Sequence, residues 1–279
     1  MVSLTCVVPA YDEEGLDDVL SGIHRALEGF IDYEVIVVDD GSHEPVEVDD
    51  EALIRHPYNM GYGAAVKTGL LRSNGDRVLI IDADGTYPAE RIPSLLEGDY
   101  DMVVGSRTGD EVSIPLVRRP AKWLLTSLAK YLSGFDIPDL NSGLRVFRRE
   151  LALEFLHLYP RGFSFTTTIT LAFLCNDYTV KYVPIDYHSR SGDSKSKISP
   201  LSDGFGFLLL ILRTILYFNP LKVFMPLSAL MLSLAGLVFM YSTMVLGQVM
   251  DITVTSITVT AVEVALFGLL ADLVVKRAR

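Results

Sequence analysis

The stretch from Val223 to Leu246 contains 24 consecutive residues and no charged side chain. At a rise of about 1.5 Å per residue, a helix of this length spans roughly 36 Å, which exceeds the ~30 Å hydrocarbon core of a bilayer. A second apolar stretch runs from Ile252 to Val275 and is interrupted by Glu263 and Asp272. Since only residues 247–251 separate the two stretches, we expect a transmembrane hairpin with spans at about 223–246 and 252–275.

Basic residues flank the outer ends of this hairpin and do not occur in its short loop. They are Arg213 and Lys222 before the first span, and Lys276, Arg277 and Arg279 after the second. By the positive-inside rule, the outer ends and the domain that precedes them lie in the cytoplasm. The sequence therefore predicts a multi-pass protein of the cell membrane, in contact with the lipid bilayer, whose large N-terminal domain is on the cytoplasmic side.

A shorter apolar run, Phe205–Phe218, has 14 residues and contains Arg213, so it is too short to span a bilayer. It predicts an interfacial amphipathic or re-entrant helix, with a buried core helix as the alternative. The expected organisation is a domain over residues 1–198, an interfacial region over 199–221 and the hairpin over 222–279. Because Glu263 costs roughly 3 kcal/mol in hydrocarbon, we expect it to face the other helix, another subunit of a homo-oligomer or arginine-bearing interface residues. Guidance of the lipid phosphate is the less favoured alternative.

Residues 1–198 alternate between short apolar runs and helical segments. The runs predict strands near 2–8, 34–38, 77–81, 101–104, 144–147 and 179–185, and the segments predict helices near 12–29, 61–72 and 91–97. Such alternation is typical of an α/β domain in which helices cover a mainly parallel sheet.

Polar residues follow four of these predicted strands. The segments are Pro9–Glu14, Asp39–Ser42, Asp82–Asp84 and Gly105–Arg107. Ligands of an open parallel sheet bind beyond the carboxyl ends of its strands, so we expect one binding site along this edge. Taken singly, residues 39–42 are also compatible with a plain turn, and residues 12–14 with helix capping.

Asp82 and Asp84 are two residues apart at a predicted strand end, so both carboxylates can lie on the same side. Two hard oxygen ligands favour Mg²⁺ or Mn²⁺ holding a diphosphate over zinc. None of the five histidines stands in a His-Glu-x-x-His pattern, and Cys6 and Cys175 are the only cysteines. Residues 59–63 are interpreted as a loop of close approach, because the glycines of 61–66 match a dinucleotide fingerprint only weakly.

The formal net charge of −11 argues against a nucleic-acid partner. Residues 1–115 hold 7 basic and 24 acidic side chains, whereas residues 116–198 hold 12 basic and 7 acidic ones. An acidic segment next to a basic one suggests two ligand surfaces in one domain, with an acidic solvating surface as the alternative.

Three of these segments together resemble the signature of family 2 glycosyltransferases with a GT-A-type fold: Pro9–Glu14, Asp39–Ser42 and Asp82–Asp84. Asn141–Arg145 and Val183–Lys195 resemble the Ser-Gly-Phe-Arg and Val-Pro-Ile…Arg…Gly-Glu-Ser-Lys elements of the dolichol-phosphate mannose synthase branch. The resemblance covers about residues 2–198. The chain departs from it at Thr86, where relatives often have Gln, and conservatively at Leu144 and Asp193. Thr86 leaves the third protein contact of the metal open.

The resemblance implies a role for each matching residue. Pro9, Tyr11, Glu13, Asp39 and Asp40 would hold the nucleotide of a nucleotide-diphosphate sugar; Asp82 and Asp84 would sit at the metal and the donor diphosphate; Asp84, Arg107, Arg119 and Arg145 would act in catalysis; and Arg145, Arg190, Ser194 and Lys195 would bind the acceptor phosphate. Arginine suits such two-point contacts with phosphate.

The implied reaction is a single inverting displacement that moves one hexose onto a polyprenyl (dolichyl) phosphate. A phosphate monoester with a second pKa near ~6 is already mostly dianionic at neutral pH, so no strong base is needed. The alternatives are a processive polysaccharide synthase and a non-catalytic membrane scaffold. The first is disfavoured because the only tryptophan, Trp123, follows Ala121-Lys122 and not a Gln-x-x-Arg sequence.

Overall fold

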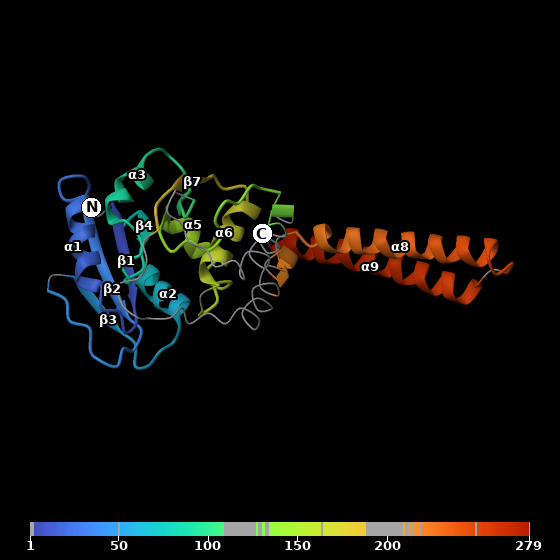
Figure 1. Cartoon of the computed structure of the whole chain (residues 1–279), viewed down its shortest axis with the longest axis horizontal. Helices are drawn as coiled ribbons and strands as arrows, with labels where there is room; N and C mark the ends of the chain where they lie inside the picture. The colour runs from blue at the N-terminus through green and yellow to red at the C-terminus, as the bar shows by residue number, and fades with distance from the viewer. Residues whose placement is uncertain are drawn as a thin grey trace. The chain divides into compact units, whose positions relative to one another are not determined.

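The computed structural model describes residues 3–49, 51–108, 134–162, 164–187, 219–248 and 250–278, together with positions 127, 130, 131, 209, 212, 213 and 215–217 (Figure 1). The chain folds into two compact units, residues 1–211 and 212–279. Most of the predicted interfacial region, 199–221, lies outside the described residues.

A seven-stranded sheet forms the centre of the N-terminal unit. Its strands are β1 (Leu4–Ala10), β2 (Tyr33–Asp39), β3 (Ala52–Arg55), β4 (Arg77–Ile80), β5 (Met102–Ser106), β6 (Arg145–Arg148) and β7 (Val180–Pro184). They lie in the order β3-β2-β1-β4-β6-β5-β7. All neighbouring pairs are parallel except those of β6, which runs antiparallel to both β4 and β5. The predicted mainly parallel sheet is thus confirmed.

Helices cover both faces of this sheet because successive strand residues point to opposite sides. Leu4, Cys6 and Val8 of β1 pack in one cluster with α1 (Leu16–Leu27) and α3 (Ile92–Leu96). On the other face, Gly69 of α2 (Tyr62–Arg72) lies so close to β1 that a Cβ atom there would be 2.3 Å from a methyl carbon of Val7. The further helices are η1 (Ala89–Arg91), α5 (Arg149–Glu154) and α6 (Phe165–Cys175).

The observed strands begin and end within about two residues of the six that the sequence predicts. One strand, β3, was not among them. It has only four residues, lies at the edge of the sheet beside β2, and has mostly exposed side chains. A short strand of this kind lacks the continuous apolar pattern of a buried one.

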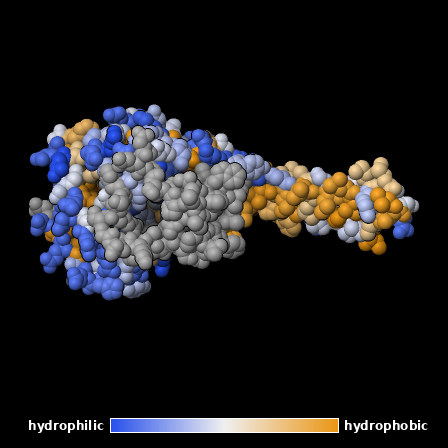
Figure 2. All heavy atoms as spheres, viewed as in Figure 1, coloured by the Kyte–Doolittle hydropathy of each residue, from blue (hydrophilic) through white to orange (hydrophobic). Residues whose placement is uncertain are grey.

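The C-terminal unit is a helical hairpin of α8 (Leu221–Met244) and α9 (Asp251–Ala278). Both helices are long and apolar enough to cross a membrane. Their side chains form an apolar outer surface, whereas the described surface of the N-terminal unit is mainly hydrophilic (Figure 2). The helices meet along small residues: Ser228 Oγ donates to the Ala261 carbonyl oxygen at 2.7 Å, and Gly268 lies against Phe224.

Candidate active site

The polar segments that follow β1, β2, β4 and β5 meet at one edge of the sheet, since these strands are parallel. Strand β6 contributes to the same edge in the opposite sense. Because it is antiparallel, its first residue, Arg145, and the preceding loop lie beside the last residues of β4 and β5. The reversed strand therefore brings the Asn141–Leu144 segment to the carboxyl edge.

The two aspartates after β4 are held in different ways. Asp84 is buried, and its Oδ1 accepts hydrogen bonds from the Thr86 hydroxyl at 2.6 Å and the Thr86 N–H at 3.1 Å. Asp82 lies against Gly143, where a Cβ atom would fall 2.3 Å from its Oδ2. Thr86 thus orients Asp84 through hydrogen bonds, and the third protein contact of a bound ion stays open.

The carboxylate oxygens at this edge are suitable ligands for a hard divalent cation. Magnesium-type ions are commonly held by one or two carboxylates together with phosphate oxygens of the substrate. Among the described residues, no group of three or more His, Cys, Asp or Glu side chains gathers into a complete cage. Asp82 lies against the Gly143 backbone, and Asp84 is held by Thr86. Their carboxylates supply two oxygen ligands of the kind that a diphosphate-bound ion requires.

Asp39, at the end of β2, is fully buried and accepts hydrogen bonds with both carboxylate oxygens. Its Oδ1 accepts the Ser42 N–H at 2.8 Å and its Oδ2 accepts Arg55 Nε at 2.6 Å. Burial by itself raises the pKa of the Asp39 carboxyl, but the hydrogen bonds from Ser42 and Arg55 outweigh it and lower the pKa. Asp39 is therefore a fixed carboxylate at the expected nucleotide end of the edge.

Asp40 organises the loop before α2. Its Oδ2 accepts the Gly61 N–H at 2.8 Å, and its Oδ1 accepts the Met60 N–H at 2.9 Å and lies 2.7 Å from His56 Nδ1. The following glycine, Gly63, approaches the backbone of residues 160–162 so closely that a Cβ atom would lie 2.2 Å from the Pro160 carbonyl oxygen. The expected close approach at 59–63 is thus made to the chain's own backbone.

The segment after β1 is braced against the segment after β2. Asp12 has a positive φ of 52°, and its carboxylate contacts both the backbone N–H and the Nδ1 of His43, each within 2.8 Å. The Tyr11 ring lies 6.2 Å from the His43 ring. Pro9 is buried inside β1, and Glu13 is partly exposed just beyond it.

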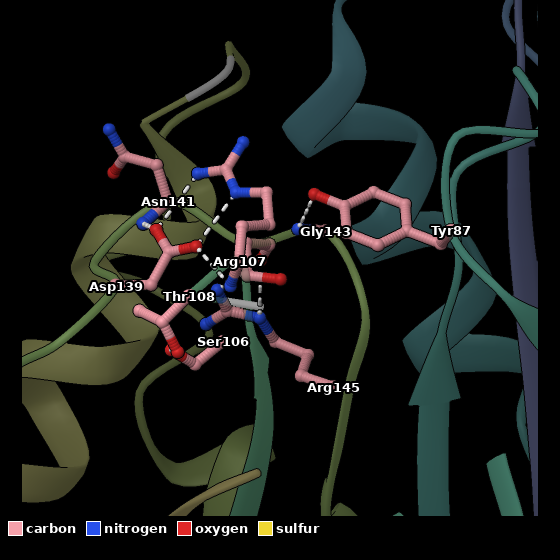
Figure 3. Close-up of polar contacts among 9 residues, drawn as sticks. Tyr87, Ser106, Arg107, Thr108, Asp139, Asn141, Gly143 and Arg145 are labelled. Atoms are coloured by element: carbon pink, nitrogen blue, oxygen red, sulfur yellow. Dashed lines mark hydrogen bonds and ion pairs between the residues drawn. The ribbon is translucent and has the colours of Figure 1, made fainter. Parts of the chain in front are cut away.

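Arg107 is held by a residue that the sequence reasoning missed. Asp139 accepts Arg107 Nε at 2.7 Å and Nη2 at 2.8 Å, as well as the Arg107 backbone N–H at 3.0 Å (Figure 3). The guanidinium also lies 5.3 Å from the centre of the Tyr187 ring. Burial lowers the pKa of Arg107, but the hydrogen bond with Asp139 outweighs it and raises the pKa. The only sequence signal for Asp139 is its place two residues before Asn141.

The loop that carries Asp139 is tied to the aspartate loop. The Gly143 N–H donates to the Tyr87 hydroxyl at 2.7 Å (Figure 3). The Tyr87 ring also meets the Tyr187 ring edge-on at 5.3 Å. Burial is the main reason that the pKa of Tyr87 is raised, so the hydroxyl stays protonated at neutral pH. The Tyr87 hydroxyl thus keeps Asp82 and the Arg107–Asp139 pair on adjacent loops.

Arg145 lies beneath the edge and is fully buried. Its guanidinium donates to the Ser142 and Thr166 carbonyl oxygens and to Thr170 Oγ1, with the two threonine contacts at 2.9 Å. This position differs from the expected direct contact with a phosphate, since the side chain's hydrogen bonds go to the chain's own oxygens. Arg119, Arg190, Ser194 and Lys195 lie outside the described residues.

A mainly parallel sheet with paired aspartates at its carboxyl edge is the architecture of a nucleotide-binding α/β domain. Residues 5–156 match the model of the family described as Glycosyl transferase family 2. The chain belongs to this family, as the resemblance of its motifs implied.

The chain is similar to several curated proteins. The "low-salt glycan biosynthesis hexosyltransferase Agl6" of Haloferax volcanii is 32% identical over 71% of this chain, and the chain spans about half (51%) of that protein. The "dolichyl-phosphate hexose transferase" of the same organism is 31% identical, with 72% of this chain and 89% of that protein covered. The "dolichol-phosphate mannosyltransferase" of Pyrococcus furiosus is 31% identical, with 70% and 60% covered.

A solved structure shares the fold. Glucosyl-3-phosphoglycerate synthase from Mycobacterium tuberculosis, in complex with Mn²⁺, UDP-glucose and phosphoglyceric acid, aligns with a TM-score of 0.59 and 19% identity. The alignment covers 77% of this chain and 80% of that one. This likeness shows the fold, and the metal and sugar nucleotide are properties of that enzyme.

Proposed function

We propose that the chain is a membrane-bound, inverting glycosyltransferase that moves one hexose from a nucleotide-diphosphate sugar to a polyprenyl phosphate. The family and the names of the similar proteins support the donor and acceptor classes. The observation that carries the proposal is the edge at which Asp82 and Asp84 lie beside the loop of the Arg107–Asp139 pair, in a chain that ends in two helices of membrane-spanning length.

In this proposal the nucleotide binds near Pro9, Tyr11, Glu13, Asp39 and Asp40, and its diphosphate lies at Asp82 and Asp84. Mg²⁺ or Mn²⁺ bound there would neutralise the diphosphate as it leaves. Asp84 is held by the Thr86 hydroxyl, so this carboxylate does not have to reorganise during the reaction, and Asp82 lies directly against Gly143.

The acceptor side depends on positive charge. The acceptor phosphate is itself the nucleophile, so the chain has only to position it in line with the anomeric carbon. Arg119, Arg190, Ser194 and Lys195 remain our proposed phosphate contacts, together with the Arg107 guanidinium. Given its burial, Arg145 acts on this phosphate through the Ser142 carbonyl and the loop that it holds.

The hairpin supplies a surface suited to the isoprenoid part of the acceptor. A cavity of about 560 Å³ lies within the C-terminal unit and is lined by apolar side chains. Its walls include Tyr217, Phe224, Phe267 and Leu270. This cavity is near the end of α8 that begins at Leu221, which is the end of the hairpin that the flanking charges assign to the cytoplasmic side.

The proposal is tested by offering radiolabelled nucleotide sugars and polyprenyl phosphate to the purified full-length protein, with Mg²⁺, with Mn²⁺ and with a chelator. We expect one sugar per lipid, dependence on the divalent ion, and a loss of at least ~100-fold in Asp84→Asn. Asp99→Asn is the matched control, because Asp99 is 83% exposed in surface ion pairs.

Other results would contradict the proposal. A ladder of long polymers would identify a processive synthase. Wild-type transfer by the Asp84→Asn protein would contradict the assignment of the metal site. Calorimetry that detects no binding of any nucleotide sugar, with or without Mn²⁺, would indicate a non-catalytic scaffold.

A further inference from the structure

A stripe of polar side chains runs along one exposed face of α9. Thr253, Ser256, Thr260 and Glu263 are all exposed and are separated by three, four and three residues. This spacing keeps the four side chains on one side of the helix over roughly 15 Å of its length. They form a polar surface on a helix whose other exposed side chains in this region include Ile252, Val259 and Val262.

This polar stripe is not the face with which α9 meets α8. The contact face carries Ala261, which is fully buried and whose carbonyl oxygen accepts Ser228 Oγ at 2.7 Å. Gly268, seven residues further, is packed against Phe224. Of the positions expected for Glu263, a contact with the other helix of the hairpin is therefore wrong.

Glu263 has no hydrogen bond or ion pair with any described residue of the chain, and the cations of the hairpin lie at its ends. Lys276 is paired with Asp272 at 2.8 Å. Lys276 is also 13 residues from Glu263, about 20 Å along the helix axis. An ionisable side chain in hydrocarbon is costly unless it faces a polar partner.

We propose that the polar stripe is an interface between two copies of this chain, packed in parallel through α9. The inference rests on the proposed insertion of the hairpin into a membrane. A second copy in the same membrane presents the same stripe at the same depth, so each carboxyl and hydroxyl of one copy meets a polar group of the other. The three- and four-residue spacing is the one that lets two helices stay in register along a shared seam.

The hydrogen-bonding groups of the stripe complement one another. Thr260 Oγ1 donates its proton to the Ser256 carbonyl oxygen at 2.9 Å, so the hydroxyl oxygen can accept a further bond. The Glu263 side chain one turn away, as a neutral carboxylic acid, can donate its O–H to the Thr260 hydroxyl oxygen or to the Glu263 carboxyl of the second copy. A partner helix without polar groups at this spacing would leave the stripe in lipid.

Disulfide cross-linking of the full-length chain in native membranes tests this interface. Thr260→Cys lies on the stripe, and Val262→Cys lies at nearly the same depth, about 160° away around the helix. The native Cys6 and Cys175 are both buried, and the unsubstituted chain gives the background. We expect a species of twice the chain mass at least ~5-fold more abundant for Thr260→Cys than for Val262→Cys. Equal cross-linking at the two positions, or none at either, would overturn the proposal.

A second pair of variants tests the carboxyl group itself. In the Thr260→Cys background, Glu263→Gln keeps the hydrogen-bonding capacity and should retain most of the cross-link, whereas Glu263→Leu should reduce it several-fold. Undiminished cross-linking in the leucine variant, or an adduct with a different protein in place of the double-mass species, would refute a self-association through this stripe.

Alkaline carbonate extraction of the same membranes separates this inference from the proposed anchor. If the chain stays in the membrane pellet but does not cross-link, only the interface is wrong. If carbonate releases the chain, the membrane insertion on which both proposals depend is wrong.

Discussion

The guanidinium of Arg107 is held at two points by Asp139, and the same carboxylate accepts the backbone N–H groups of Arg107 and Asn141. One residue thereby fixes both a cation of the candidate site and the start of the loop that reaches Asp82. Two-point arginine–carboxylate contacts are geometrically specific as well as strong.

Asp139→Asn should therefore damage both functions of this carboxylate. We expect transfer to fall by ~10- to 100-fold and the unfolding free energy to fall by about 3 kcal/mol, because the substitution leaves a largely buried cation, 21% exposed, without its counter-charge. Kinetics and denaturant unfolding check this. In Asp99→Asn, the activation free energy of transfer and the unfolding free energy should each stay within about 0.5 kcal/mol of the parent, because the ion pair of Asp99 is exposed.

Gly143 is required by the space that Asp82 occupies. In Gly143→Ala the new Cβ would lie 2.3 Å from Asp82 Oδ2, so the carboxylate or the loop has to move. We expect at least a ~10-fold loss of kcat and a raised requirement for Mg²⁺ or Mn²⁺ in the assay. Gly162→Ala is the control, because a Cβ there meets nothing within 4 Å. Equal kinetics in the two variants would show that Asp82 does not need its present position.

Asp39, at the candidate nucleotide end of the site, makes the unfolding free energy depend on pH. Its hydrogen bonds lower its pKa in the folded state, so its contribution is complete above the unfolded pKa of about 4 and is lost as the pH falls through the folded value. Arg55→Gln should reduce the unfolding free energy by about 1–2 kcal/mol at pH 7, and this difference should shrink below pH ~4. Urea unfolding across pH 2.5–7 measures it. A difference that widens with acid would contradict the assignment.

At the level of secondary-structure elements, the two membrane-length helices pack against each other through small residues. Ser228, Ala235 and Ser242 recur every seven residues on α8 and are all buried. This repeat is the one that keeps a helix face turned toward its neighbour, with the close approach that small residues allow in lipid.

Gly268→Leu should disrupt this pairing, because even a Cβ at position 268 would lie 2.5 Å from the Phe224 Cβ. We expect the helix pair to lose about 1–3 kcal/mol, measured by denaturing the purified chain in mixed micelles of increasing SDS content. The same substitution at Gly236, where a Cβ meets nothing within 4 Å, should change the midpoint little. A Gly268→Leu protein as resistant as Gly236→Leu would contradict the observed packing.

The sequence was sufficient to predict six of the seven strands but not all of their pairings. Apolar runs ending in aspartates located β1, β2 and β4, because burial and the carboxyl-edge rule leave local signals. The reversed direction of β6 has no such signal, since the direction of a strand is decided by its neighbours. Asp139 was missed because its partner Arg107 is 32 residues away. Arg145 was expected to bind the acceptor phosphate, and its full burial was not foreseen because arginines are rarely fully buried.

At the scale of the whole molecule, the orientation of the hairpin remains a prediction from its flanking charges. Gln248, in the loop between α8 and α9, and Glu28, after α1, are both exposed. In intact cells, a membrane-impermeant maleimide should label Gln248→Cys, whereas Glu28→Cys should react only after permeabilisation. The reverse pattern would place the glycosyltransferase domain outside the cell.

The strand order has a consequence for how the chain folds during synthesis. Strands β1 to β4 are consecutive in the chain and adjacent in the sheet, so they can pair as soon as residue 80 has left the ribosome. Strand β5 pairs only with β6 and β7, which are made at least 39 residues later. The nascent protein therefore carries β5 without a partner until residue 148 emerges and with one open edge until residue 184 emerges, and slower translation across 107–184 lengthens its exposure to aggregation.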